Sequence, residues 1–122
     1  MIPEDVQQFI QTSIPSVWTL ELLLLMRRQP TLSWTTEALD RELRASSLVV
    51  ANGLTVLMAA GLVVEEQPGN FRYHPARADL AEMIDRLVVA VADFPFAVNQ
   101  LIFAAPENKL RTFANAFRLK RD

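Results

Sequence analysis

The chain of 122 residues has no cysteine, a single histidine and only three glycines. Without cysteine there is no disulfide framework and no thiolate chemistry. The lone His74 lacks the second ligand or partner that a metal site or a nucleophilic triad requires. Three glycines are too few for a loop that cradles phosphate. We therefore expect a protein that is not an enzyme and that has no catalytic residues, no metal and no cofactor.

A secretory signal and a long hydrophobic run are also missing. The N-terminus, Met-Ile-Pro-Glu-Asp, is acidic and has no apolar core after a basic start. Residues 18–26 are apolar but too few to span a bilayer, and residues 87–105 are interrupted by Asp93 and Pro95. These features predict a cytoplasmic protein without a membrane span. A length of 122 residues predicts one compact unit, and its hydrophobic fraction of 51% suggests burial against another chain.

Positive charge is scarce outside the C-terminal end. Residues 1–108 hold 7 Lys/Arg against 13 Asp/Glu, and residues 109–122 hold 5 against 1, for a net charge of −2. An acidic body argues against non-specific binding of nucleic acid by the whole protein. At the C-terminal end, Leu110, Phe113 and Phe117 either pack on the body, leaving the basic residues in solvent, or present them to an anionic partner. These basic residues are Lys109, Arg111, Arg118, Lys120 and Arg121.

The first 45 residues predict three helices. A short helix starts near Pro3, and Ser16 caps a strongly apolar second helix, Val17–Arg28. Thr35 or Thr36 caps a third helix, from about Thr36 to Arg44. A short extended piece, residues 32–34, lies between the second and third helices.

Residues 46–73 carry the most informative pattern. Ser46 is a good N-cap for a helix with Val50, Leu54 and Leu57 on its buried face, and Gly61 is placed to end that helix. Two short strand-like pieces, residues 62–66 and 71–73, flank the turn residues 68–70. The expected order is helix, short strand, helix, turn, helix and two-stranded hairpin.

Residues after Pro75 predict a long apolar helix with a further helix beyond it. Leu80, Ile84, Leu87 and Val91 recur at helical spacing, and Pro95 either kinks or restarts the helix. We expect residues 1–75 to form one domain and residues 76–122 a helical extension of the same compact unit. The many apolar positions in 80–103 predict a homodimer contact. The charged residues of this helix, Asp79, Glu82, Asp85 and Arg86, are expected to form pairs within it.

Residues 16–75 resemble the winged helix-turn-helix superfamily, and most closely the MarR-type and PadR-type bacterial transcription regulators. The resemblance lies in the helix 36–44, in Ala59-Ala60-Gly61-Leu62-Val63, and in the hairpin 65–73. It implies a mainly α fold with a small β-wing, followed by C-terminal dimerisation helices. It also implies regulation of transcription, with the Ser46 helix and the wing as the contact elements.

The chain departs from these regulators where they contact DNA. Between Ser46 and Asn70 there is no Lys or Arg, and Glu65 and Glu66 stand where a basic residue is common. Major-groove readout relies chiefly on Arg, Lys, Asn and Gln, which here leaves Asn52. The Ser46 helix is therefore an inert structural helix, a protein-contact surface or a weak DNA reader. Its contact candidates are Ser46, Ser47, Leu48, Val49, Asn52, Gly53 and Val56. Apart from the cap Ser46, we expect all of these, and Thr55, on the outer side of the helix.

We favour a non-enzymatic regulatory module that acts mainly through protein contacts, with weak or partner-assisted DNA binding. The alternative is a homodimeric, sequence-specific DNA-binding regulator that reads DNA with Ser46, Ser47, Asn52 and Arg72. Its phosphate contacts would come from Arg27, Arg28, Arg41 and Arg44, and its wing contacts from Gly69, Asn70 and Arg72. If Arg72 does not contact DNA, we expect it to pair with a nearby acid. A third alternative, a small-ligand sensor, needs a pocket near Trp18, Trp34 or Phe94.

Overall fold

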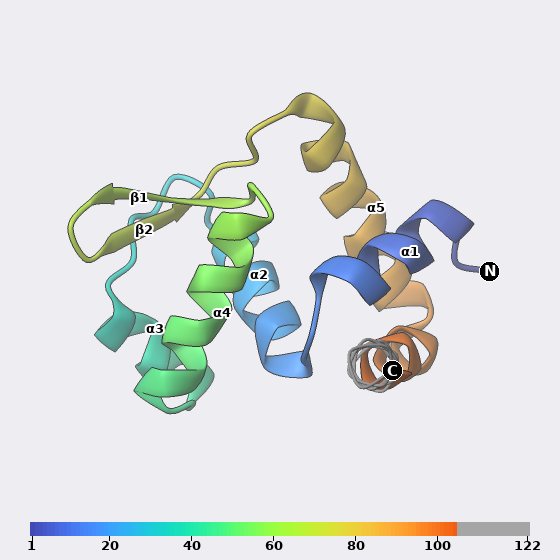
Figure 1. Cartoon of the computed structure of the whole chain (residues 1–122), viewed down its shortest axis with the longest axis horizontal. Coiled ribbons are helices and arrows are strands. Elements are labelled where there is room, and N and C mark those ends of the chain that lie inside the picture. Colours follow the sequence, from blue (N-terminus) through green and yellow to red (C-terminus); the bar gives the residue numbers. More distant parts are fainter. Residues whose placement is uncertain (105–122) are drawn as a thin grey trace, which may run out of the picture.

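The computed structural model describes residues 1–104 and is mainly helical, with one small antiparallel sheet (Figure 1). This confirms the predicted α-rich class with a small β-hairpin. The elements in chain order are α1 (Glu4–Ser13), α2 (Val17–Arg28), α3 (Thr36–Leu43), α4 (Ser47–Ala59), β1 (Val63–Gln67), β2 (Asn70–Tyr73), α5 (Ala78–Asp93) and the helix Pro95–Ala104.

Hydroxyl side chains begin three of these helices at the predicted positions. Ser16, Thr35 and Ser46 are the N-caps of α2, α3 and α4, and each side-chain oxygen accepts from a backbone N–H three residues later, at 3.1 or 3.2 Å. Such a bond satisfies an amide that has no partner inside the helix and contributes about 1 kcal/mol. The predicted helix starts are thus correct to within one residue.

Gly61 ends α4 by turning the chain into the hairpin. Its φ is +78°, a left-handed conformation that glycine adopts without strain. The Gly61 N–H donates to the Met58 carbonyl and the Leu62 N–H to the Leu57 carbonyl, each at 3.0 Å. These two bonds satisfy the last carbonyls of α4 and point the chain toward β1.

The hairpin is joined to the segment between α2 and α3. Trp34 N–H donates to the Phe71 carbonyl at 2.7 Å, and Phe71 N–H donates back to the Trp34 carbonyl at 2.8 Å. The extended piece expected at residues 32–34 therefore adds one bridging residue to β2, on the side opposite β1. This bridge holds the hairpin beside the start of α3.

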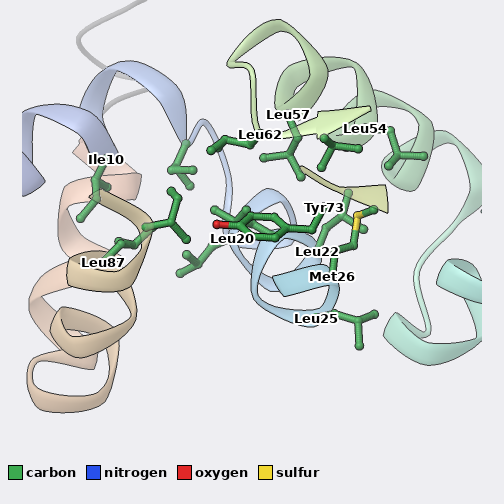
Figure 2. Packing of buried hydrophobic residues seen from close by; sticks show 14 of the residues in the cluster. Ile10, Leu20, Leu22, Leu25, Met26, Leu54, Leu57, Leu62, Tyr73 and Leu87 are labelled. Carbon is green, nitrogen blue, oxygen red and sulfur yellow. The ribbon is translucent and has the colours of Figure 1, made fainter. Parts of the chain in front are cut away.

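The hydrophobic core lies on both sides of α2 (Figure 2). On one side, Leu22 and Met26 of α2 pack near Leu54 and Leu57 of α4, and all four are at most 1% exposed. Burial of a leucine side chain of this kind contributes about 1.5–3 kcal/mol. On the other side, α1 lies against α5 (Figure 1). The N-terminal helix is therefore packed with the C-terminal helices, although the sequence grouped it with residues 1–75.

Pro95 restarts the helix rather than kinking it. α5 ends at Asp93, Phe94 adopts a non-helical conformation, and the next helix begins at Pro95 with a bend of 114°. A proline at the first helical position is favourable because its missing N–H has no partner there in any case. The new helix packs back on the body through Val98 and Ile102, which are at most 1% exposed.

The expected pairing within α5 is wrong for Asp85 and Arg86, because both pair with other helices. Arg86 donates two hydrogen bonds to the Asp5 carboxylate of α1, at 2.6 and 2.8 Å. Arg27 of α2 donates to Asp85 at 2.8 Å. The paired residues are 81 and 58 positions apart in the chain. The spacing of residues within one helix cannot predict such pairs.

Among residues 1–104, no single helix is long and apolar enough to cross a membrane. Two helix pairs meet the criteria of length and composition only when combined, and they are bent by 110° and 114°.

The ion pair between Asp5 of α1 and Arg86 of α5 leads to a prediction about the pKa of Asp5. Its hydrogen bonds to Arg86 lower the pKa of Asp5 from the ordinary value of 3.8. Because the pKa of Asp5 is lower in the folded state, the stabilisation is present above pH 3.8 and is lost as the pH falls through the folded-state pKa. We expect Arg86→Gln to raise the pKa of Asp5 toward its ordinary value, as measured by NMR of the side-chain carboxyl.

Asp79 is the internal control for that titration. Arg77 lowers its pKa in the same way, through a hydrogen bond of 2.9 Å, and Arg86→Gln leaves that contact intact. An Asp5 pKa that is identical in the wild type and in Arg86→Gln would mean that the pair is absent in solution.

Candidate functional site

The candidate site is built from α3, α4 and the hairpin, and a tight turn fixes the first two against each other. Arg44 has a left-handed φ of +54°, and the Ala45 N–H donates to the Asp40 carbonyl at 3.3 Å. Ser47 Oγ donates to the Asp40 carboxylate at 2.7 Å. Ser46 caps α4, and Ser47 bonds across the turn, so both hydroxyls serve to orient α4.

The outer side of α4 is uncharged. We define the α4 face by its exposed residues, which are Ser47, Leu48, Ala51, Asn52, Thr55 and Ala59. Leu48 is 70% exposed, whereas Val49 and Val56 are half-buried at the edges of this face. Of the predicted outer positions, the exposed ones are Ser47, Leu48, Asn52 and Thr55. The α4 face offers one amide, two hydroxyls and several apolar groups.

Gly53 is the exception, because the expectation that it lies on the outer side is wrong. It is buried, and a Cβ at this position would lie 2.8 Å from Leu22 Cδ2 of α2. Gly53 therefore allows α2 and α4 to approach closely and has no access to a partner. Since Val50, Leu54 and Leu57 are buried on the same side, Gly53 belongs to the inner face of the helix.

Acidic residues outnumber basic ones around the α4 face. Residues 30–74 contain three arginines, which are Arg41, Arg44 and Arg72, against five Asp or Glu. Arg41 and Arg44 are exposed near the α3–α4 turn. They are accompanied by the exposed acids Glu37 and Glu42. The surroundings of the α4 face thus lack the excess of positive charge that attracts a polyanion.

The other two phosphate candidates lie on α2. Arg27 forms the ion pair with Asp85 of α5, so this guanidinium is directed at α5. Arg28 is exposed and lines a groove between α2 and α3, together with Trp18 and Glu42. Of the four predicted phosphate contacts, only Arg41 and Arg44 are therefore exposed close to the start of α4.

The wing candidates are arranged as a neutral tip and a paired arginine. The tip residue Gly69 has a φ of +83°, and its N–H donates to the Glu65 carboxylate at 2.9 Å. Arg72 Nε lies 2.8 Å from Glu66, as expected for an arginine paired with a nearby acid. Asn70 begins β2 and is half-buried. The charge of Arg72 is thus compensated within the hairpin.

Two titratable groups follow the tip of the hairpin. Burial raises the pKa of Tyr73, whose ring lies beside Leu20 of α2 (Figure 2). His74 is exposed, and its Nδ1 lies 3.3 Å from the Pro75 carbonyl. Within residues 1–104, no three His, Cys, Asp or Glu side chains gather in a way that could hold a metal ion.

The three aromatic residues suggested for a ligand pocket differ in their surroundings. Trp34 is only 6% exposed, and it lines none of the hollows described below. Trp18 lines the groove between α2 and α3, which has a volume of about 400 Å³. Phe94 lines two hollows of about 340 and 520 Å³ beside the N-terminal residues Met1 and Ile2. The basic C-terminal candidates, residues 109–121, lie outside the described residues.

A second set of exposed apolar residues lies on α5 and the segment that follows it, and was only broadly indicated by the sequence. Its apolar residues are Val89, Phe94, Phe96 and Phe103, which are 39–74% exposed. Phe96 and Phe103 are seven residues apart in the helix Pro95–Ala104 and so lie on one side of it. We call these four residues the aromatic surface. The spacing of the two phenylalanines after Pro95 was the signal that could have located it.

Comparison with family models, with curated proteins and with solved structures gave no match to this chain.

The close approach of α2 and α4 at Gly53 leads to a stability prediction. We expect Gly53→Leu to lower the free energy of unfolding by about 2 kcal/mol or more, because the new side chain overpacks the contact with Leu22. Ala51→Leu is the matched control, since it places the same side chain on the exposed side of the same helix and should change stability by less than about 0.5 kcal/mol. Urea denaturation measures both, and equal effects would contradict the buried position of Gly53.

Proposed function

We propose that residues 16–75 form a winged helix-turn-helix domain. The order of elements supports this reading: helix α2, bridging residue Trp34, helix α3, a tight turn, helix α4 and a two-stranded hairpin. In such a domain α4 corresponds to the recognition helix and the hairpin to the wing. The fold alone does not assign a function, because winged helices contact both nucleic acids and proteins.

We infer that the protein is a regulatory module that works mainly through protein contacts. The observation that carries this inference is the α4 face, which has no charged residue and exposes 70% of Leu48. Fully buried interface cores are depleted in charge and contain apolar anchors. An exposed leucine surrounded by small neutral residues suits such a contact better than it suits a phosphate backbone.

Direct DNA binding is the alternative, and the charges of the site weaken it. Phosphate contacts by Lys and Arg supply most of non-specific DNA affinity. Here Arg72 and Arg27 are engaged by acids, which leaves Arg41 and Arg44 as exposed arginines near α4. Asn52 is exposed and has the amide that can pair with adenine. We therefore propose that DNA binding is weak or depends on a partner.

We also propose that the aromatic surface makes a homodimer. Phe96 and Phe103 are 74% and 68% exposed, and Phe94 lines two hollows of about 340 and 520 Å³. Exposed aromatic rings of this kind suit a two-fold contact in which the same residues face each other. The four side chains offer roughly 400 Å² per copy, and two copies together approach the range of weak, reversible interfaces.

A DNA titration tests the function. With mixed-sequence duplex DNA at low salt, we expect dissociation constants of about 10⁻⁶ M or weaker, and Arg41→Gln/Arg44→Gln should weaken binding further. Fluorescence anisotropy at several salt concentrations measures both. Far tighter binding to the same DNA, falling steeply with added salt, would contradict the protein-contact proposal and favour the DNA-binding alternative.

Crosslinking in cells provides the positive test. A photoreactive amino acid at Asn52 should give adducts mainly with protein, because the α4 face would lie against a protein partner. The same amino acid at Glu82, an exposed residue of α5, is the matched control and should not give those adducts. Adducts mainly with DNA at position 52 would overturn the proposal.

Sedimentation tests the dimer. We expect a mass that rises from monomer to dimer over micromolar concentrations, and Phe96→Ser/Phe103→Ser should weaken association by at least about 100-fold through the loss of two apolar contacts. Leu48→Ser, which removes a similarly exposed side chain from the α4 face, should leave association unchanged. A monomer mass at all concentrations would contradict the proposed dimer.

A further inference from the structure

A groove between α2 and α3 has chemistry that neither the α4 face nor the aromatic surface uses. Its volume is about 400 Å³, and we call it the Trp18 groove. Leu25 is its most buried lining residue, at 6% exposure, and the indole of Trp18 is 45% exposed. The other main lining residues are Glu21, Arg28, Glu42 and Leu43.

The two glutamates of the groove have no ion-pair partner within residues 1–104. Arg28 also lines the groove but forms no ion pair with either glutamate, so the groove keeps one net negative charge. Arg27, Arg72, Arg77 and Arg86 are paired with other acids. An exposed indole face attracts a cation, and a guanidinium or ammonium group also bonds well to carboxylates. The Trp18 groove therefore suits a basic side chain that is accompanied by apolar neighbours.

The C-terminal segment of the same chain has that composition. Residues 109–122 contain five Lys or Arg and one acid, whereas residues 1–104 contain seven Lys or Arg and twelve acids. The apolar residues Leu110, Phe113 and Phe117 are interspersed with the basic ones. Charge and composition are thus complementary between this segment and the groove.

The length of the segment allows it to reach the groove. The 18 residues that follow Ala104 span up to roughly 60 Å when extended. A folded body of 104 residues has a radius of gyration of only about 13 Å. Contact with any part of the surface of the same molecule is therefore within reach.

We propose that the Trp18 groove is the docking site for residues 105–122 of the same chain, with a basic side chain of that segment held by Trp18, Glu21 and Glu42. Glu42 and Leu43 are the last residues of α3, directly before the Arg44 turn that orients α4. Occupation of the groove thus links the C-terminus to the base of the α4 face. This contact is independent of the proposed protein or DNA partner of α4.

Limited trypsin digestion of the full chain tests the docking. The double variant Glu21→Gln/Glu42→Gln removes both charges of the groove and introduces no new cleavage site. We expect the initial rate of cleavage after Arg111 and Arg118 to rise roughly twofold to tenfold, the size of effect that two partly exposed ion pairs produce. Cleavage after Arg77 in the same sample, at a bond that no substitution adjoins, reports any general loosening of the fold.

The control is Glu37→Gln/Glu82→Gln, which removes two exposed glutamates that do not line the groove. This variant should leave the cleavage rates of the C-terminal sites unchanged. Equal rates in the two double variants would overturn the docking. Protection that appears only at high protein concentration would also overturn it, because the occupant would then belong to a second copy.

NMR of the two indole N–H groups gives a second readout that does not depend on proteolysis. We expect Phe113→Ala/Phe117→Ala in the full chain to shift the Trp18 signal, assigned with Trp18→Phe, and to leave the signal of the buried Trp34 in place. A Trp18 signal that does not move would count against the proposal.

Discussion

The close crossing of α2 and α4 is the constraint on which the rest of the structure depends. Gly53 has no side chain, so α4 can approach Leu22 of α2, and Leu54 and Leu57 then reach the core. Because one side of α4 is used in this way, its remaining residues form the α4 face. The Gly61 turn then carries the chain into the hairpin, and Trp34 bonds to Phe71 and holds the hairpin beside α3.

The uncharged α4 face is the observation on which the proposed function rests. A helix held by a cap, a cross-turn hydrogen bond and a close contact with α2 is well oriented to present its outer side to a partner. That side contains Leu48 and Asn52 and no arginine or lysine, and the arginine of the wing is compensated by Glu66. We give this lack of positive charge more weight than the order of the elements, because affinity for DNA requires positive charge.

The helices outside the proposed winged-helix domain form a second layer. α1 packs on α5, and the ion pairs of Arg86 with Asp5 and of Arg27 with Asp85 link three helices that are distant in the chain. The break at Phe94 and Pro95 then folds the next helix back, so that Val98 and Ile102 are buried while Phe96 and Phe103 face outward. The outward position of Phe96 and Phe103 therefore follows from the restart of the helix at Pro95.

The sequence by itself determined the features that depend on neighbouring residues. The hydroxyl caps at Ser16, Thr35 and Ser46, the glycine end of α4 and the turn of the hairpin are local, because each is decided by the preference of a residue and the backbone within a few positions of it. The absence of charge on the Ser46 helix could also be read directly from the sequence.

Tertiary structure alone decided which residues meet from distant parts of the chain. Gly53 was expected outside and lies inside, because only the approach of α2 shows which side of an almost uniformly apolar helix is covered. The partners of Asp85 and Arg86 were expected within α5 and instead come from α2 and α1. Helical spacing gives the direction of a side chain relative to its own helix, but the position of the neighbouring helix is set by the packing of the whole core.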